Sequence, residues 1–323
     1  MDDGPLLHAK QAGLLWLAGF RQACCLQRVV LSCKSSRKLL IRTGQCFLLN
    51  GLIFLGSLLF LNKVVIPTLF WILPDQCKEL VFQDLCIHGA VMRFYSFLRF
   101  ILIDLFYVFW FYPLYASSFI LSNIWYCDIA KMGFERSGLH FEASANKNEV
   151  PNSQSVGNVD KPAGIEGAII GIGEQVYSVL LLTIFYIEVF ATGYIPFIGK
   201  AINFLLLSWM YAYYCFEYKW NLAGWSLDKR LNFFESNWAF FAGFGSPCVL
   251  AILFFTPLVS YAVMAILFPL FVLTAIGTNE EQVISSQRRS WRGGPRKLPI
   301  FYAANVLSMK VLQLFPEGDK KMQ

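Results

Sequence analysis

Long apolar stretches separated by short polar segments dominate the sequence. Residues 45–67, 94–126, 176–216 and 247–276 are almost continuously hydrophobic. About twenty apolar residues are enough for a helix to cross a bilayer, and a helix satisfies its own backbone hydrogen bonds in hydrocarbon. The pattern therefore predicts an all-α, polytopic membrane protein with about six membrane-embedded helices.

Two of these stretches contain turn-forming residues that divide them. Residues 176–216 are interrupted by the segment 193–199, which begins and ends with glycine and contains Pro196. This punctuation predicts a helical hairpin with a short lumenal turn. Residues 247–276 contain Pro257 and allow either one tilted span or a tight or re-entrant hairpin.

Basic residues are concentrated at the two ends of the chain. Those that precede the first apolar stretch are Lys10, Arg21, Arg28, Lys34, Arg37, Lys38 and Arg42. The loop at residues 75–89 contains only Lys78. Because Lys and Arg are retained on the cytosolic side, this loop is predicted to be lumenal and both termini cytosolic. The number of crossings is then even, which favours a hairpin at residues 247–276.

These features divide the chain into three predicted parts. Residues 1–43 form a basic cytosolic region with an interfacial helix that faces an anionic lipid surface. Residues 44–276 form the transmembrane helical domain, and residues 277–323 form a basic cytosolic tail. Within the domain, residues 142–164 are rich in Asn, Ser, Gly and Pro and predict a disordered cytosolic loop.

A second amphipathic segment, residues 225–242, separates two apolar stretches. Its large apolar side chains recur at steps of four and three, at Leu227, Leu231, Phe234, Trp238 and Phe241. The opposite side carries Asp228, Lys229, Asn232, Glu235 and Ser236. This spacing predicts one helix that lies along the headgroup boundary. A helix packed on the protein's own core fits the same pattern equally well.

Composition and motifs exclude several other classes of function. The chain has 56% hydrophobic and 15% charged residues, which is typical of membrane proteins. Its net charge of +6 is not accompanied by a basic segment with base-reading side chains, so nucleic-acid binding is not expected. Nine cysteines and three histidines show no metal-ligand spacing, and no catalytic motif is present, so we expect no metal, no cofactor and no enzymatic activity.

Ionisable residues inside the apolar stretches are the default candidates for function, because a charge in hydrocarbon costs several kcal/mol. They are Arg99, Asp104 and Glu188. Arg99 precedes Asp104 by five residues and can reach it with its flexible stem. Glu188 lacks a basic neighbour at helical spacing and either bonds to a tyrosine or stays protonated. A structural role is favoured over transport for both acids.

Three pairs of polar residues are predicted to interact or to act as a signal. Glu217 and Arg230 lie on either side of a turn and are expected to form a structural ion pair. Cys77 and Cys86 share the lumenal loop, where an oxidising environment permits a disulfide or two free thiols. Lys320 and Lys321 form a di-lysine pattern of the type that coat proteins read as a retrieval address.

Three motifs in the C-terminal half carry a family resemblance. They are YCFEYKW at residues 214–220, RLNFFESNWAFFAGFGSP at 230–247 and FPLFVLTA at 268–275. This combination resembles the etoposide-induced protein 2.4 family and, more distantly, the bacterial CysZ-type sulfate permeases. The residues that carry the resemblance most clearly are Glu217, Tyr218, Trp220, Arg230, Trp238, Phe244, Gly245 and Pro247.

The resemblance implies a function that the composition alone does not. It implies an endoplasmic-reticulum membrane protein of the autophagy machinery, in a family also linked with growth suppression, apoptosis and importin-beta binding. The alternative is a sulfate or anion permease, in which glycine-rich helix ends near Gly171 and Gly243 would cradle the oxyanion. A membrane enzyme would require a catalytic cluster that only the fold brings together.

Overall fold

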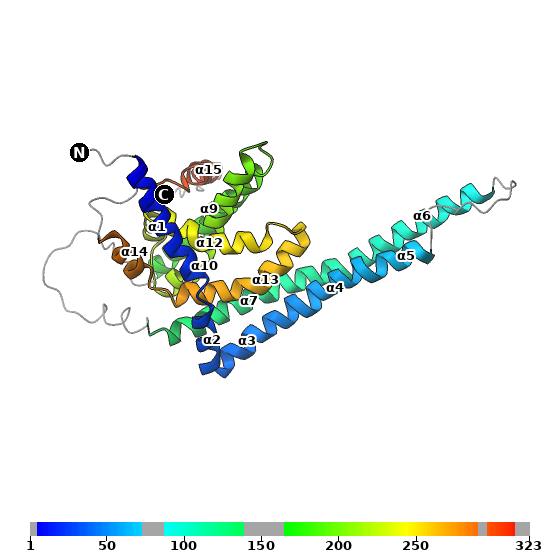
Figure 1. The fold of residues 1–323 in the computed structure, drawn as a ribbon, viewed down its shortest axis with the longest axis horizontal. Coiled ribbons are helices and arrows are strands. Elements are labelled where there is room, and N and C mark those ends of the chain that lie inside the picture. Colours follow the sequence, from blue (N-terminus) through cyan, green and yellow to red (C-terminus); the bar gives the residue numbers. More distant parts are fainter. Residues whose placement is uncertain (1–4, 73–86, 139–164, 290–295, 314–323) are drawn as a thin grey trace, which may run out of the picture. The chain divides into compact units, whose positions relative to one another are not determined.

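The computed structural model of the chain describes residues 5–72, 87–138, 165–289 and 296–313 (Figure 1). Every regular element in these ranges is a helix, which confirms the predicted all-α class. The chain divides into two compact units. Unit 1 contains residues 1–31, 130–250 and 270–323, and unit 2 contains residues 32–129 and 251–269.

The described ranges contain α-helices and short π-helical turns. In chain order, they are α1 (Pro5–Ala23), α2 (Leu26–Ser35), α3 (Arg37–Phe47), η1 (Leu48–Leu55), α4 (Gly56–Phe60), η2 (Leu61–Val65), α5 (Ile66–Ile72), α6 (Ile87–Phe106), η3 (Tyr107–Phe111), α7 (Tyr112–Arg136), α9 (Ile165–Thr192), α10 (Gly199–Leu222), α11 (Leu227–Ser236), α12 (Trp238–Ile252), α13 (Pro257–Ile276), α14 (Glu280–Arg288) and α15 (Tyr302–Gln313). Elements labelled η are π-helical turns within longer helices.

Within the described residues, four helical runs are long and apolar enough to cross a membrane. They are Arg37–Ile72, Arg93–Arg136, Gly173–Thr192 and Pro257–Ile276. Helix α12 is also apolar but has only 15 residues. Helix α10 is not among the four, because Lys200, Asn203 and several tyrosines lower its hydropathy. The membrane class is therefore confirmed, with four candidate spans and the shorter α12 where about six embedded helices were predicted.

The hairpin predicted at residues 176–216 is present as a pair of helices. Helices α9 and α10 are joined by residues 193–198, and the Asn203 amide donates to the Val189 carbonyl at 2.6 Å. In that turn, Phe197 has a φ of 62° and is almost fully exposed. The region predicted as one tilted span or a hairpin, residues 247–276, contains a break at residues 253–256 between α12 and α13.

In unit 1, glycines allow α12 to touch two neighbouring helices at the backbone. A Cβ atom added to Gly243 would collide with the backbone of Trp16 in α1, and one added to Gly19 would collide with the carbonyl of Phe240. Gly245 lies equally close to the backbone of Ser208 in α10. Small residues permit such close helix contact. Helix α12 is consequently clamped between α1 and α10.

In unit 2, a buried asparagine links three helices. Pro269 has no N–H, so the Ala265 carbonyl one turn earlier in α13 lacks its helical partner. Asn50, fully buried in η1, donates to this carbonyl at 3.4 Å and to the Ser122 hydroxyl at 2.9 Å. The Tyr126 hydroxyl donates to the same carbonyl at 2.7 Å. The freed backbone group is thereby satisfied by side chains from two other helical runs.

A matched pair of substitutions tests the contact between α1 and α12. Gly19→Ala should lower the unfolding free energy by about 1–3 kcal/mol, because its methyl group overpacks the contact. Gly13→Ala, in the same helix but with no atom within 4 Å of the added Cβ, should be neutral or stabilising by up to about 1 kcal/mol. Thermal unfolding in detergent measures both. Equal stability of the two variants would contradict the contact.

A second pair of substitutions tests the linking role of Asn50 in unit 2. Asn50→Leu should cost about 1–2 kcal/mol, because it leaves buried polar groups unpaired in apolar surroundings. Asn123→Leu is the control, since the exposed Asn123 side chain donates only to Phe119 in its own helix. Unfolding temperatures in the same detergent distinguish them. A larger loss for Asn123→Leu than for Asn50→Leu would refute the linking role.

Candidate functional site

The candidate site is the segment at residues 213–247, which we call the joint. It comprises the end of α10, a turn at Gly224 with a φ of 71°, helix α11 and the first part of α12. The prediction of a single helix at residues 225–242 is wrong. The Asn237 side chain donates to the Phe233 carbonyl at 2.8 Å, and its backbone φ of −122° ends α11. A side chain that captures a backbone carbonyl competes with helix continuation.

The aromatic stripe of the joint packs inside the protein. Phe234 and Phe241 stack with their ring centroids 4.4 Å apart, and Phe216 meets Phe241 at 5.2 Å. Tyr213 contacts Phe234 edge to face at 5.5 Å. All four side chains are fully buried. Of the two interpretations of this stripe, the structure supports the helix packed on the protein's own core.

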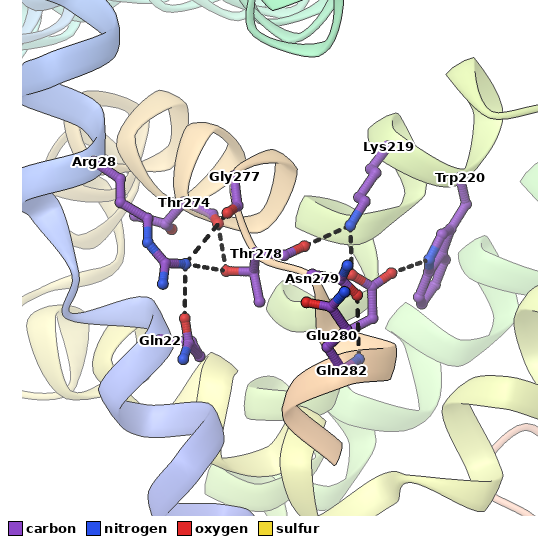
Figure 2. A network of polar contacts seen from close by, with 10 residues as sticks. All are labelled: Gln22, Arg28, Lys219, Trp220, Thr274, Gly277, Thr278, Asn279, Glu280 and Gln282. Carbon is purple, nitrogen blue, oxygen red and sulfur yellow. Dashed lines mark hydrogen bonds and ion pairs between the residues drawn. The ribbon is translucent and has the colours of Figure 1, made fainter. Parts of the chain in front are cut away.

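A buried ion pair connects α10 with the beginning of α14 (Figure 2). The Lys219 ammonium pairs with the Glu280 carboxylate, and their side chains are only 8% and 3% exposed. Lys219 also donates to the Thr278 carbonyl at 2.5 Å, and the Trp220 indole donates to Glu280 at 3.0 Å. Glu280 thus receives a hydrogen bond at each carboxylate oxygen, which is what a buried charge requires.

The loop before α14 is held from its other side by Arg28 (Figure 2). Its guanidinium donates to the Gly277 carbonyl at 3.3 Å, to the Thr278 hydroxyl at 3.4 Å and to the Gln22 amide oxygen at 2.8 Å. The Asn279 side chain caps α14 by accepting from the Gln282 N–H at 3.1 Å. This loop is therefore fixed by α10 on one side and by α2 on the other.

The predicted pair of Glu217 and Arg230 is also present. Arg230 Nη1 lies 3.9 Å from Glu217 Oε1, and the Arg230 side chain is 5% exposed. Arg230 donates through Nε and Nη2 to the Trp225 carbonyl at 2.9 and 2.7 Å. The Ser178 hydroxyl donates to Glu217 at 3.4 Å. The pair closes the turn between α10 and α11 and connects it to α9.

A third carboxylate, Glu235, binds the segment before α15. Its Oε1 accepts from the Phe301 N–H at 3.1 Å, and its Oε2 lies 3.2 Å from the Lys297 ammonium. The Glu235 carbonyl accepts from the Leu298 N–H at 3.2 Å, and the Trp238 indole donates to the Arg296 carbonyl at 3.1 Å. The sequence pattern places Glu235 on the polar side of its helix, but its side chain is buried against this segment.

Helix α14 makes one further contact with the joint. Arg288 Nη2 donates to the Ser236 carbonyl, at the end of α11, at 2.9 Å. Burial lowers the pKa of the Arg288 guanidinium from its ordinary value, although arginine stays charged throughout the physiological range. This bond adds a cation at the C-terminal end of α11, where the helix dipole favours it.

The intramembrane ionisable residues do not form one cluster. The Arg99 guanidinium is buried and lies over the Phe70 ring, 4.1 Å from its centroid, whereas Asp104 is exposed. Glu188 is half-buried, and its Oε1 has no hydrogen-bond partner within the described part of the chain. Gly243, a candidate oxyanion cradle, is instead filled by the backbone of α1.

Several predicted sites lie outside the described residues. They are the Cys77 and Cys86 pair, the loop at residues 142–164, and Lys320 with Lys321. Among the residues that the structure describes, no group of three or more His, Cys, Asp or Glu side chains is arranged to hold a metal ion.

The geometry of the joint indicates what it does. Glu217, Glu235 and Glu280 each have a lysine or arginine nitrogen within 4 Å. These pairs connect α10 and α11 with α14 and with the segment before α15. The joint thus uses its buried charges to hold helices together, and these three carboxylates are already paired with cations of the same chain.

A double-mutant cycle measures the energetic coupling between Lys219 and Glu280. Lys219→Met should cost about 3–5 kcal/mol, because it leaves the Glu280 charge buried without a partner. Lys219→Met with Glu280→Gln should be less damaging than the sum of the two single changes. Lys310→Met, at an exposed position in α15, serves as the control. Additive losses in thermal unfolding would show that the two side chains are not coupled.

Comparison with known proteins gives several relatives. The family model described as Sulfate transporter CysZ/Etoposide-induced protein 2.4 matches residues 25–269. A Protein EI24 homolog of Arabidopsis thaliana is 62% identical over 311 residues, covering 95% of this chain and 96% of the relative. A Protein EI24 homolog of Dictyostelium discoideum is 26% identical over 303 residues, covering 94% and 84%.

A shorter similarity involves the Ectopic P granules protein 4 of Caenorhabditis elegans, which is 35% identical over 86 residues, or 26% of this chain and 27% of that protein. No solved structure shows a significant match. The resemblance found in the three sequence motifs is confirmed by matches that extend over most of the chain. The chain belongs to the Sulfate transporter CysZ/Etoposide-induced protein 2.4 family.

Proposed function

We propose that the chain is a multi-spanning endoplasmic-reticulum membrane protein that acts as a membrane scaffold in autophagosome formation. The family membership supports the process, and the closed, internally paired joint supports the scaffold. A scaffold needs helices that keep a fixed arrangement, and three ion pairs provide this. The proposal includes no catalytic step. Roles in growth suppression, apoptosis and importin-beta binding are secondary proposals that rest on the family alone.

The observation that carries the proposal is the pairing of the buried lysine and arginine of the joint. An anion path would offer cations or backbone N–H groups that replace the hydration shell of the ion. Here Lys219 is bound by Glu280 and a carbonyl, and Arg230 is bound by Glu217 and a carbonyl. Both cations are already neutralised by this chain's own residues.

A second candidate is a sulfate or anion permease. The description of the matching family, which includes a sulfate transporter, favours it. Within the described part of the chain, the buried Glu188 Oε1 of α9 has no hydrogen-bond partner, and a hydrogen-bond donor on a bound solute would satisfy it. An acid on a span is a poor site for a dianion, since like charges repel. The scaffold is therefore the better-supported function.

Localisation follows from the proposed topology. With both termini in the cytosol, Lys320 and Lys321 would be available to coat proteins, which would return the protein to the endoplasmic reticulum. Autophagy proteins would be its cytosolic partners. The basic ends of the chain, whose positive charge outweighs the acidic balance of the middle part, fit this orientation.

Complementation tests the proposal. Cells that lack the protein should form fewer completed autophagosomes, and the wild-type chain should restore them. Lys320→Ser with Lys321→Ser should redistribute the protein from the endoplasmic reticulum to later compartments, whereas Lys310→Ser should not. Autophagosome counts and fluorescence microscopy provide the readouts. Normal autophagosome formation in cells without the protein would refute the scaffold role, and an unchanged distribution would refute the retrieval signal.

A further inference from the structure

Helix α1 has two different faces. The inner face carries Gln11, Leu15 and Gly19, which are buried in unit 1, and Gly19 touches the backbone of α12. This backbone contact fixes the rotation of α1 about its axis. The residues on the opposite side are therefore held outward by the fold.

The outer face combines leucine with basic side chains. Leu7, Leu14 and Leu17 are 39%, 40% and 46% exposed, and Lys10 and Arg21 are exposed as well. These five positions follow one another at steps of three and four, so they share one side of the helix. All five side chains are exposed, and we call the surface that they form the outer face of α1.

The charge of the region is entirely positive. Residues 5–35, which form α1 and α2, contain four basic residues and no Asp or Glu. Helix α2 continues the mixture, with Val30 and Leu31 at 50% and 66% exposure and the exposed basic residue Lys34. A partner for this surface must therefore supply apolar contact and negative charge side by side.

We infer that the outer face of α1 docks onto the anionic phospholipid surface of the bilayer that holds the spans. Leucines reach about 5–10 Å into the boundary between headgroups and acyl chains, and long basic side chains extend to the phosphates. A protein groove for an amphipathic helix would instead select a continuous apolar stripe. Here Lys10 and Arg21 interrupt the leucines, which fits a lipid surface better.

This inference goes beyond the proposed function and does not depend on it, because a scaffold and a permease would both carry such a helix. The backbone contact between Gly19 and α12 gives it a structural consequence. Since α1 is clamped to α12, attraction to anionic headgroups acts on the core of unit 1 and not on a loose terminal segment.

Photo-crosslinking of the full chain in lipid nanodiscs tests the docking. A photo-reactive amino acid replaces Leu17 on the outer face or, as the matched control, Leu15 on the inner face. The discs contain phosphatidylcholine alone or mixed with phosphatidylserine, and mass spectrometry detects lipid or protein adducts. The probe at position 17 should form several-fold more lipid adducts in the mixed discs, because each basic residue adds attraction to an anionic surface. The probe at position 15 should crosslink to protein in both.

A charge variant completes the experiment. Lys10→Gln with Arg21→Gln should reduce lipid adducts at position 17 to the level seen without phosphatidylserine. Because both side chains are exposed, its unfolding temperature should match that of the wild type. Adducts at position 17 to protein, including a second copy of the chain, would overturn the inference. So would lipid adducts whose yield depends neither on phosphatidylserine nor on the two basic residues.

Discussion

The cost of burying a charge governs the architecture of unit 1. The Lys219 and Glu280 side chains are both less than a tenth exposed, so removing either partner would leave an uncompensated ion in a poorly solvated site. Each therefore specifies where the other must lie, which places α14 against the end of α10. Glu235 does the same for the segment before α15 through Phe301 and Lys297. The ends of helices that are distant in sequence are thereby brought to one joint.

The backbone imposes a second constraint on helix packing, which takes a different form in each unit. In unit 1, Gly243 and Gly245 let α12 approach α1 and α10 so closely that backbones touch. In unit 2, Asn50 and Tyr126 satisfy the carbonyl that Pro269 leaves free. In both units, single residues within apolar stretches determine how a helix packs against its neighbours.

The sequence predicts the features that local pattern determines. Apolar stretches identified the long helices but not α14 and α15, which lie in the part predicted only as a basic tail. The pair of Glu217 and Arg230 was predicted because only a turn separates them. The pair of Lys219 and Glu280 was missed, since the partners are 61 residues apart. The break at Asn237 was missed because the apolar spacing continues through it; only the side chain's bond to Phe233 reveals it. Gly243 was interpreted as a possible oxyanion cradle because the sequence does not show which backbone approaches it.

The central claim is that the buried charges of this chain hold helices together and do not guide an anion. Sulfate uptake into liposomes containing the purified, folded protein tests this most directly, with the wild type beside Glu188→Ala. The account predicts no uptake above that of empty liposomes for either protein. Saturable uptake by the wild type that Glu188→Ala changes would contradict it and would favour a permease.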